Sequence, residues 1–316
     1  EGMFIASTHH YILFFTDRGR CHWLKVYEIP EGGRAAKGRQ ISNVLDLKGG
    51  EQVAGYIAVK EFDDKHFVVM ATRDGTVKKT ALSEFANPRK AGIIAATVDD
   101  KDALIEAKMT DGNEDVILVT HTGQACRFHE SDVRPMGRSA SGVRGITLEK
   151  KDYVIGMVAV KREGSLLTVC EKGFGKRSEI DEYRVTRRGG KGVITMKVTD
   201  KTGPVVAVKE VVDSDELMII SAGGQVIRLA LKNVRVMGRA TQGVRLINLD
   251  ARDKVVDVAR LAAKDEEENG NPDEVIKGLA AMDVFKLTLP EEYGGLVPGE
   301  EMVYANLAIQ EIARAE

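Results

Sequence analysis

The feature of this chain that most limits its fold is a pattern that recurs five times. Each copy has an apolar run, two or three polar residues, a glycine and a second run that ends in basic residues. The anchor glycines, spaced by 48 to 56 residues, are Gly19, Gly75, Gly123, Gly173 and Gly224. A second glycine follows each anchor by 17 to 19 residues, at Gly38, Gly92, Gly142, Gly192 and Gly243. Such paired spacing indicates a repeat protein.

Each copy predicts a small antiparallel sheet. The runs are short and rich in β-branched and aromatic residues, and the anchor glycine stands where a hairpin turn needs a positive φ. Two further strand-like runs follow the second glycine, for example residues 143–148 and 153–160. Four strands in a period of roughly 50 residues are typical of a propeller blade. The sequence therefore predicts an all-β propeller over residues 1–263, with almost no helix.

Cations recur at two positions of the repeat. Four residues after the anchor glycine stand Trp23, Lys79, Arg127, Arg177 and Arg228. Four residues before the second glycine stand Arg34, Pro88, Arg138, Arg188 and Arg239, with Arg89 beside the proline. Because equivalent residues of rotated blades lie on one ring, we expect a belt of positive charge that suits duplex DNA wrapped without base reading. The alternative is that these cations only end strands and protect sheet edges.

The charge of the chain is divided unevenly. Residues 1–263 hold 42 Lys or Arg and 35 Asp or Glu, a net charge of +7, whereas residues 264–316 hold 4 and 13, a net of −9. Such asymmetry is one sign of a nucleic-acid partner. The three cysteines show no paired spacing, and no apolar run approaches the roughly 18 residues of a membrane helix. We therefore expect a cytoplasmic protein with no membrane partner.

One basic segment resembles a known family. The run YRVTRRGGKG, from Tyr183 to Gly192, is similar to the glycine-rich box in the C-terminal domain of the DNA gyrase A subunit, although Thr186 replaces the Gln of the box. Residues 71–85, 133–146 and 234–247 also resemble that domain, so the resemblance covers about residues 1–263. It implies a β-pinwheel, a propeller whose neighbouring blades exchange strands, with DNA bent around its basic perimeter.

The resemblance also implies a task and partners. The domain would present a wrapped segment of double-stranded DNA to the cleavage gate, so that gyrase introduces negative supercoils. The implied partners are the rest of the gyrase A subunit and the gyrase B subunit, and the implied location is the nucleoid. The predicted DNA contacts are Lys78, Lys79, Arg127, Arg138, Lys176, Arg177, Arg187, Arg188, Lys191, Arg228 and Arg239. In the box-like loop, Gly189, Gly190 and Gly192 would let backbone N–H groups approach phosphates.

No pattern in the sequence points to catalysis. Residues 173–178 lack both the glycine spacing and the following helix of a phosphate-binding loop. The six histidines have no metal-ligand spacing, so we expect neither a metal nor a cofactor. The tyrosine with which a topoisomerase cleaves DNA belongs to another domain of the family. We therefore expect a non-catalytic fragment of an ATP-dependent type II topoisomerase.

The tail is expected to be separate from the β-pinwheel. Residues 264–275 are charged and aperiodic, which is typical of a solvated linker, and apolar residues at helical spacing in 300–316 predict a short helix. The segment LPEEYGGL at 289–296 is similar to a stretch near the N-terminus of acyl-CoA dehydrogenases. Domain boundaries at 1–263 and 264–316 follow. Because the chain opens at Glu1 on a strand-like run, we also expect a piece of a longer protein whose first blade is truncated.

Two rival functions stay open. The equivalent domain of topoisomerase IV would use the same surface to select DNA geometry rather than to wrap it. A protein-binding propeller scaffold would carry polar and aromatic loops on one face instead of a cationic rim. Binding to plain duplex DNA separates this scaffold from the other two functions.

Overall fold

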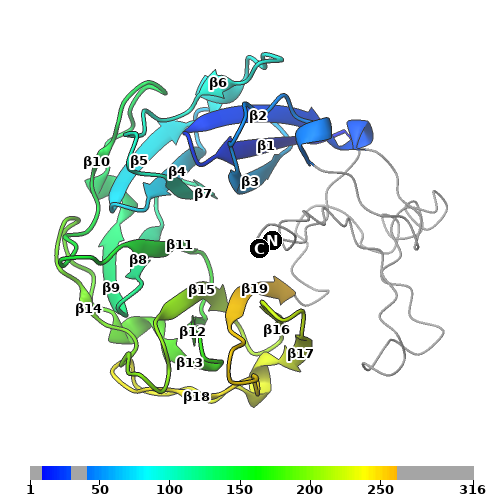
Figure 1. Cartoon of the computed structure of the whole chain (residues 1–316). Coiled ribbons are helices and arrows are strands. Elements are labelled where there is room, and N and C mark those ends of the chain that lie inside the picture. Colours follow the sequence, from blue (N-terminus) through cyan, green and yellow to red (C-terminus); the bar gives the residue numbers. More distant parts are fainter. Residues whose placement is uncertain (1–8, 30–40, 262–316) are drawn as a thin grey trace.

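The computed structural model describes residues 9–29 and 41–261, which form nineteen strands in five sheets. The sheets follow one another in chain order around an arc (Figure 1). The helical residues in this part of the chain lie in short 3-10 turns: η1 (Val26–Glu28), η2 (Ile41–Asn43), η3 (Leu82–Phe85), η4 (Glu130–Asp132), η5 (Ile180–Glu182) and η6 (Leu231–Asn233). The prediction of an all-β propeller is confirmed.

Each blade is built on a tight antiparallel hairpin. The first strands of the hairpins are β1 (Tyr11–Thr16), β4 (Phe67–Thr72), β8 (Asp115–Thr120), β12 (Ser165–Cys170) and β16 (Glu216–Ser221). Their partners are β2 (Arg20–Lys25), β5 (Thr76–Ala81), β9 (Gln124–His129), β13 (Phe174–Glu179) and β17 (Val226–Ala230). The anchor glycines have positive φ, for example +84° at Gly75, as the hairpin turn requires.

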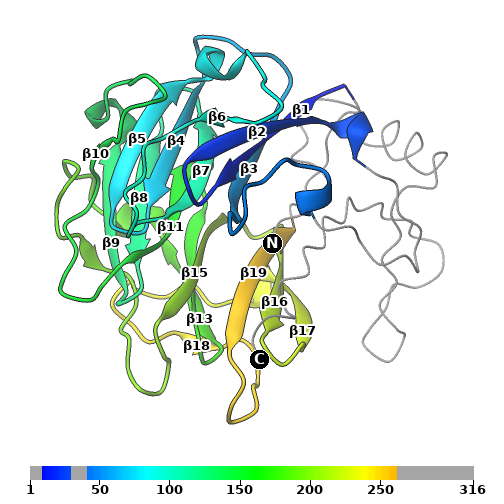
Figure 2. The ribbon, with the colours of Figure 1, turned by 45° about the horizontal axis from the view of Figure 1, so that its top comes forward.

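A long strand on the inner side of the arc pairs with each hairpin. These inner strands are β3 (Val53–Val59), β7 (Leu104–Thr110), β11 (Val154–Val160), β15 (Val205–Val211) and β19 (Val255–Leu261). Each pairs with the first strand of its own hairpin, and β7, β11 and β15 contact their neighbours from blade to blade. Figure 2 shows the inner strands from a tilted view.

The outer strand of each of the first four sheets comes from the next repeat. These two-residue strands are β6 (Ile93–Ile94), β10 (Val143–Arg144), β14 (Val193–Ile194) and β18 (Val244–Arg245). They pair with β2, β5, β9 and β13 of the preceding blade, as in the register Thr76↔Arg144. The strand exchange that the family resemblance implied is therefore confirmed, and each junction between these blades is locked by backbone hydrogen bonds.

The hydrophobic core lies between blades rather than within one. Val68 and Met70 of β4 belong to a cluster with residues of β1, whereas Val69 and Ala71 of the same strand belong to a cluster with residues of β8. Alternate side chains of a strand point to opposite faces, so both faces of a middle blade are buried. This explains why the hairpin runs read as almost continuous apolar stretches.

Several predictions from the sequence fall outside the described residues. They concern Arg34, Gly38 and the whole acidic tail at 264–316. Among residues 9–29 and 41–261, no helix has the length and apolar character needed to cross a membrane.

Candidate nucleic-acid interface

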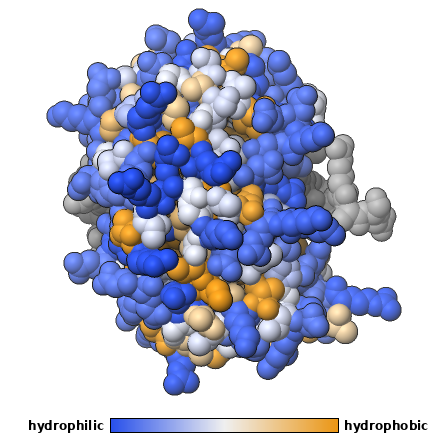
Figure 3. Space-filling model, turned by 90° about the vertical axis from the view of Figure 1, so that its left-hand side faces the viewer, coloured by the Kyte–Doolittle hydropathy of each residue, from blue (hydrophilic) through white to orange (hydrophobic). Residues whose placement is uncertain are grey.

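Four loops form the outermost layer of the blades. We call them the rim loops; they comprise residues 85–94, 134–144, 184–194 and 235–245, and each ends in the outer strand that it gives to the preceding blade (Figure 1). The four loops contain twelve Lys or Arg residues and no Asp or Glu. Figure 3 shows this outer side of the molecule as a mainly hydrophilic surface with apolar patches among the polar side chains.

Hydrogen bonds join the rim loops to one another. Thr97 Oγ1, three residues after the first loop, donates to the Ser139 carbonyl of the second loop at 2.7 Å, and Thr147 Oγ1, three residues after the second loop, donates to the Gly189 carbonyl of the third at 2.7 Å. The Lys197 N–H, three residues after the third loop, donates to the Thr241 carbonyl of the fourth at 3.0 Å. The loops therefore form a connected belt across blades rather than independent tips.

Three arginines occupy the same position in this belt. Nη1 of Arg138, Arg188 and Arg239 donates to a carbonyl of the outer strand before it, at 3.4, 3.1 and 2.9 Å respectively. All three side chains are half-exposed. The repeated bond fixes each guanidinium at the rim while part of it stays open to solvent, so this predicted set lies where a phosphate could reach it.

Some backbone groups of the box-like loop, residues 187–192, make hydrogen bonds within the protein. Arg187 and Lys191 are exposed. The Gly189 N–H donates to the Gly145 carbonyl at 2.6 Å, and the Gly190 carbonyl accepts from the Thr147 N–H at 2.9 Å. The expectation that the Gly189 N–H approaches a phosphate is thus wrong, because that donor is already bound to Gly145, the residue that follows the neighbouring rim loop.

Three of the four predicted cations that follow the anchor glycines, Lys79, Arg127 and Arg177, point into the blade junctions. Lys79, at 4% exposure, pairs with the buried Glu130 at 2.7 Å, and Arg177, at 5% exposure, donates from Nε to the Val234 carbonyl at 2.9 Å. Trp23 Nε1 donates to the Phe85 carbonyl at 2.8 Å from the same repeat position. The expected outward ring is therefore wrong for the first four blades, where the residue at this position contacts the 3-10 turn of the following blade.

Arg127 shows in detail how a side chain at this position connects two blades. Its Nε donates to Asp115 Oδ2 at 2.8 Å within its own hairpin, and its Nη1 donates to the carbonyls of Ile180 and Tyr183 at 2.8 and 3.1 Å in the next blade. Only 14% of the side chain is exposed. A guanidinium with several planar donors suits this task, because one side chain binds the two blades together.

Lys78 and Lys176 were also predicted to contact DNA, but the structure buries them. Lys78 Nζ donates to the carbonyls of Ala95 and Arg138, and Lys176 Nζ donates to those of Gly238 and Arg239. Each lysine therefore supports the backbone of a rim loop from beneath. Desolvation lowers the pKa of both ammonium groups from 10.5 to about 8.

Arg228 occupies the equivalent position in the last described blade. Its Nε donates to Glu216 Oε2 at 2.6 Å, and 40% of its side chain is exposed. In the part of the chain that the structure describes, the sheet of β16, β17 and β19 has three strands and no outer strand from a later repeat. Among the described residues, Arg228 therefore contrasts with Lys79, Arg127 and Arg177 in lying at the surface.

The sequence argument missed six exposed rim cations, one of which is Lys90. Arg134, Arg184 and Arg235 each stand eight residues before the second glycine, and Arg144 and Arg245 each stand two residues after it. Comparing the residues at every equivalent position of the repeats, rather than at two positions only, would have found them. The absence of acidic residues across the same loops was a second available signal.

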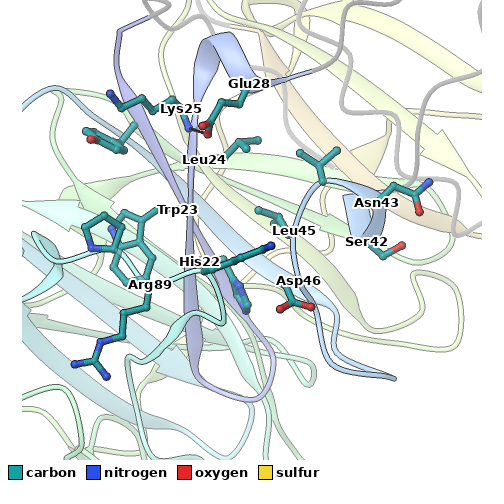
Figure 4. A pocket seen from close by; sticks show the side chains of 14 residues that line it. His22, Trp23, Leu24, Lys25, Glu28, Ser42, Asn43, Leu45, Asp46 and Arg89 are labelled. Atoms are coloured by element: carbon teal, nitrogen blue, oxygen red, sulfur yellow. Dashed lines mark hydrogen bonds between the residues drawn. The ribbon is translucent and has the colours of Figure 1, made fainter.

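A separate pocket of about 950 Å³ lies near the first blade junction (Figure 4). His22, Trp23 and Leu24 of β2 line it together with Leu45 and Arg89. Among the described residues no cluster of three or more His, Cys, Asp or Glu side chains could hold a metal ion. The pocket offers polar walls but no arrangement that specifies a cofactor.

The fold and the basic rim loops define a strand-exchanged β-propeller with a cationic outer layer. A family model described as "DNA gyrase C-terminal domain, beta-propeller" matches residues 10–60, 66–111, 114–161, 164–211 and 215–262, one blade to each match. The chain belongs to the DNA gyrase C-terminal domain family.

Similar proteins agree with this assignment. The chain is 43% identical to the DNA gyrase A subunit of Chlamydia pneumoniae over 281 residues, covering 88% of this chain and 33% of that protein. It is 44% identical to the DNA gyrase A subunit of Salmonella typhimurium over 262 residues, covering 83% and 30%. The chain thus spans about a third of the length of the curated relatives it matches.

Solved structures show the same fold. A DNA gyrase A C-terminal domain superposes with a TM-score of 0.71 at 27% identity, covering 81% of this chain and 84% of that one. The C-terminal domain of a DNA topoisomerase IV superposes with a TM-score of 0.76 at 23% identity, covering 87% and 84%, which is a likeness of fold alone. A second family model, the N-terminal domain of acyl-CoA dehydrogenase, matches residues 246–316 and includes the segment 289–296.

Proposed function

We propose that this chain binds duplex DNA without sequence preference and wraps it along the rim loops. The observation that carries the proposal is the count of twelve cations and no acidic residue in those four loops. Neutralising phosphates releases counterions, and this term is independent of sequence. Because the loops are joined and follow the arc of blades, a duplex held by one loop is led toward the next (Figure 1).

The proposed contacts are the rim cations that reach solvent. They are Arg89, Lys90, Arg134, Arg138, Arg144, Arg184, Arg187, Arg188, Lys191, Arg235, Arg239 and Arg245. Lys78, Lys79, Arg127, Lys176 and Arg177 are left out of this set because their hydrogen bonds are made inside the protein. Arg228 is left out because it lies outside the rim loops.

For the parent enzyme we propose the role that the relatives suggest. The module would present wrapped DNA to the cleavage gate of an assembly of the gyrase A and gyrase B subunits at the bacterial nucleoid, and so support negative supercoiling. Selection of DNA geometry by a topoisomerase IV remains the rival.

A salt titration tests the binding proposal. The variant Arg134→Ala/Arg184→Ala/Arg235→Ala should reduce the slope of log affinity against log salt by about 0.9 for each phosphate that is no longer neutralised, on duplexes of unrelated sequence. The matched control removes three exposed lysines outside the rim loops, with Lys101→Ala/Lys150→Ala/Lys201→Ala. Equal slopes for the wild type and the rim variant, or equal reductions for both variants, would contradict a rim interface.

A topology assay tests wrapping separately from binding. A nicked circular plasmid is sealed by ligase while the protein is bound, and the protein is then removed. Wrapping leaves a change in linking number that grows with protein concentration, whereas attachment without wrapping leaves none. The rim variant should lose the change at protein concentrations where the lysine control keeps it.

A further inference from the structure

The rim loops expose aliphatic side chains as well as cations. Seven large hydrophobic side chains are exposed in the described part of the chain. Four of these lie in the rim loops, and they are Ile94, Val185, Ile194 and Val236. A single exposed apolar side chain is ordinary on a protein surface, but a concentration of them in the loops that carry the positive charge calls for an explanation.

These aliphatic residues recur at fixed places in the repeat. Val185 and Val236 each follow an exposed arginine and precede the second glycine by seven residues. Ile94 and Ile194 are the second residues of their outer strands, and the two other outer strands have an exposed arginine there. This outward position is therefore filled either by a large aliphatic side chain or by arginine.

The backbone holds the two valines rigidly at the surface. Val185 forms a parallel bridge with Arg127, and the following Thr186 N–H donates to the Arg127 carbonyl at 2.9 Å. Val236 forms the same bridge with Arg177, and the following N–H donates to the Arg177 carbonyl at 2.8 Å. The valines therefore project outward, with 53% and 40% of their surface exposed, from a segment that cannot easily fold them inward.

We propose that these aliphatic side chains make van der Waals contact with the deoxyribose walls of the bound duplex, beside the phosphates that the arginines neutralise. This inference rests on the proposed DNA binding. A duplex is the occupant that the charge favours, because the four loops that carry these side chains contain twelve cations and no carboxylate of their own. Sugar carbons are present at every nucleotide, so the contact adds affinity without reading sequence.

Apolar and ionic contacts respond differently to salt, which makes the proposal testable. Val185→Ser/Val236→Ser should weaken binding by about tenfold at every salt concentration, as expected when two partly buried aliphatic contacts are removed. The slope against log salt should stay unchanged, because every phosphate contact is kept. A second variant, Ile94→Ser/Ile194→Ser, should behave in the same way.

The control variant carries a substitution of an exposed valine outside the rim loops. Val256→Ser changes an exposed valine, at 45% exposure, on the inner strand β19 and should bind like the wild type. Unchanged affinity for both double variants, with melting temperatures equal to the wild type, would overturn the sugar contact. Loss of binding to another gyrase domain, with DNA affinity intact, would assign the patch to a protein partner instead. Absence of salt-dependent binding by the wild type would refute the proposed function itself.

Discussion

Removal of Arg177 should open the junction between the fourth and fifth blades without changing DNA binding. The Nε of this buried residue holds the Val234 carbonyl at 2.9 Å, and its Nη1 pairs with Asp213. In Arg177→Ala the Val234 carbonyl has no partner, which costs about 1 to 3 kcal/mol. Removal of the buried aliphatic stem adds about 1 to 2 kcal/mol, whereas the pair with the 80% exposed Asp213 contributes little.

The expected destabilisation is therefore about 3 kcal/mol at one junction. In a repeat protein each blade contacts mainly its neighbours, so the effect should be local. Hydrogen exchange followed by mass spectrometry should show amides of β16, β17 and β19 exchanging about a hundredfold faster, while those of β1 and β4 keep their wild-type rates.

Arg228→Ala is the matched control for this experiment. Arg228 has the same repeat position but pairs with Glu216 at the surface, so its removal should cost less than about 1 kcal/mol. The reasoning would be refuted if Arg177→Ala left the exchange rates unchanged and instead lowered the salt slope of DNA binding by about one unit. That result would return Arg177 to the DNA interface.

Two further perturbations test how the rim loops are supported. Burial lowers the pKa of Lys78 and Lys176 from 10.5 to about 8. Between these two pH values the unfolded chain binds more protons than the folded chain. The free energy of unfolding should therefore rise from pH 8 to 10.5, by up to about 3 kcal/mol for each lysine. Urea unfolding of Lys78→Met/Lys176→Met should lack this rise, and an equal rise in both proteins would contradict it. Gly192→Ala should destabilise the loop by at least about 2 kcal/mol, because φ is +81° and the new Cβ would stand 2.5 Å from a backbone oxygen. Gly190→Ala, where the nearest atom would be 3.8 Å away, should melt at or above the wild-type temperature, and equal destabilisation of both variants would show that the backbone is not the cause.

The blade architecture was accessible from the sequence because its signals are local. A hairpin turn needs its glycine within a few residues of both strands, so Gly75 and its four equivalents mark the hairpins directly. The short β-branched runs then identify the strands. Strand exchange is a contact between residues of different repeats, as in Thr76↔Arg144, and it was expected only from the family resemblance.

The candidate site was predictable only in part. The position of Arg138, Arg188 and Arg239 was found from the repeat, and the structure places it at the rim. The direction of the Lys79 and Arg177 side chains was predicted wrongly. A charge that recurs at equivalent positions of a repeat does not show whether the side chain points to solvent or into the protein. In a half-exposed strand, alternation would have revealed the direction, but in these blades both faces of the hairpin are buried.

The sequence by itself determined the number of hairpins, their order, the β class of the fold and the concentration of positive charge in residues 1–263. These properties depend on local backbone preferences and on composition. They can be read without knowing which segments pack against each other. Only the tertiary structure decided which cations meet solvent and which clasp the next blade. That choice depends on the register between segments about 50 residues apart, because a carbonyl such as that of Val234 must lie within hydrogen-bonding distance of Arg177.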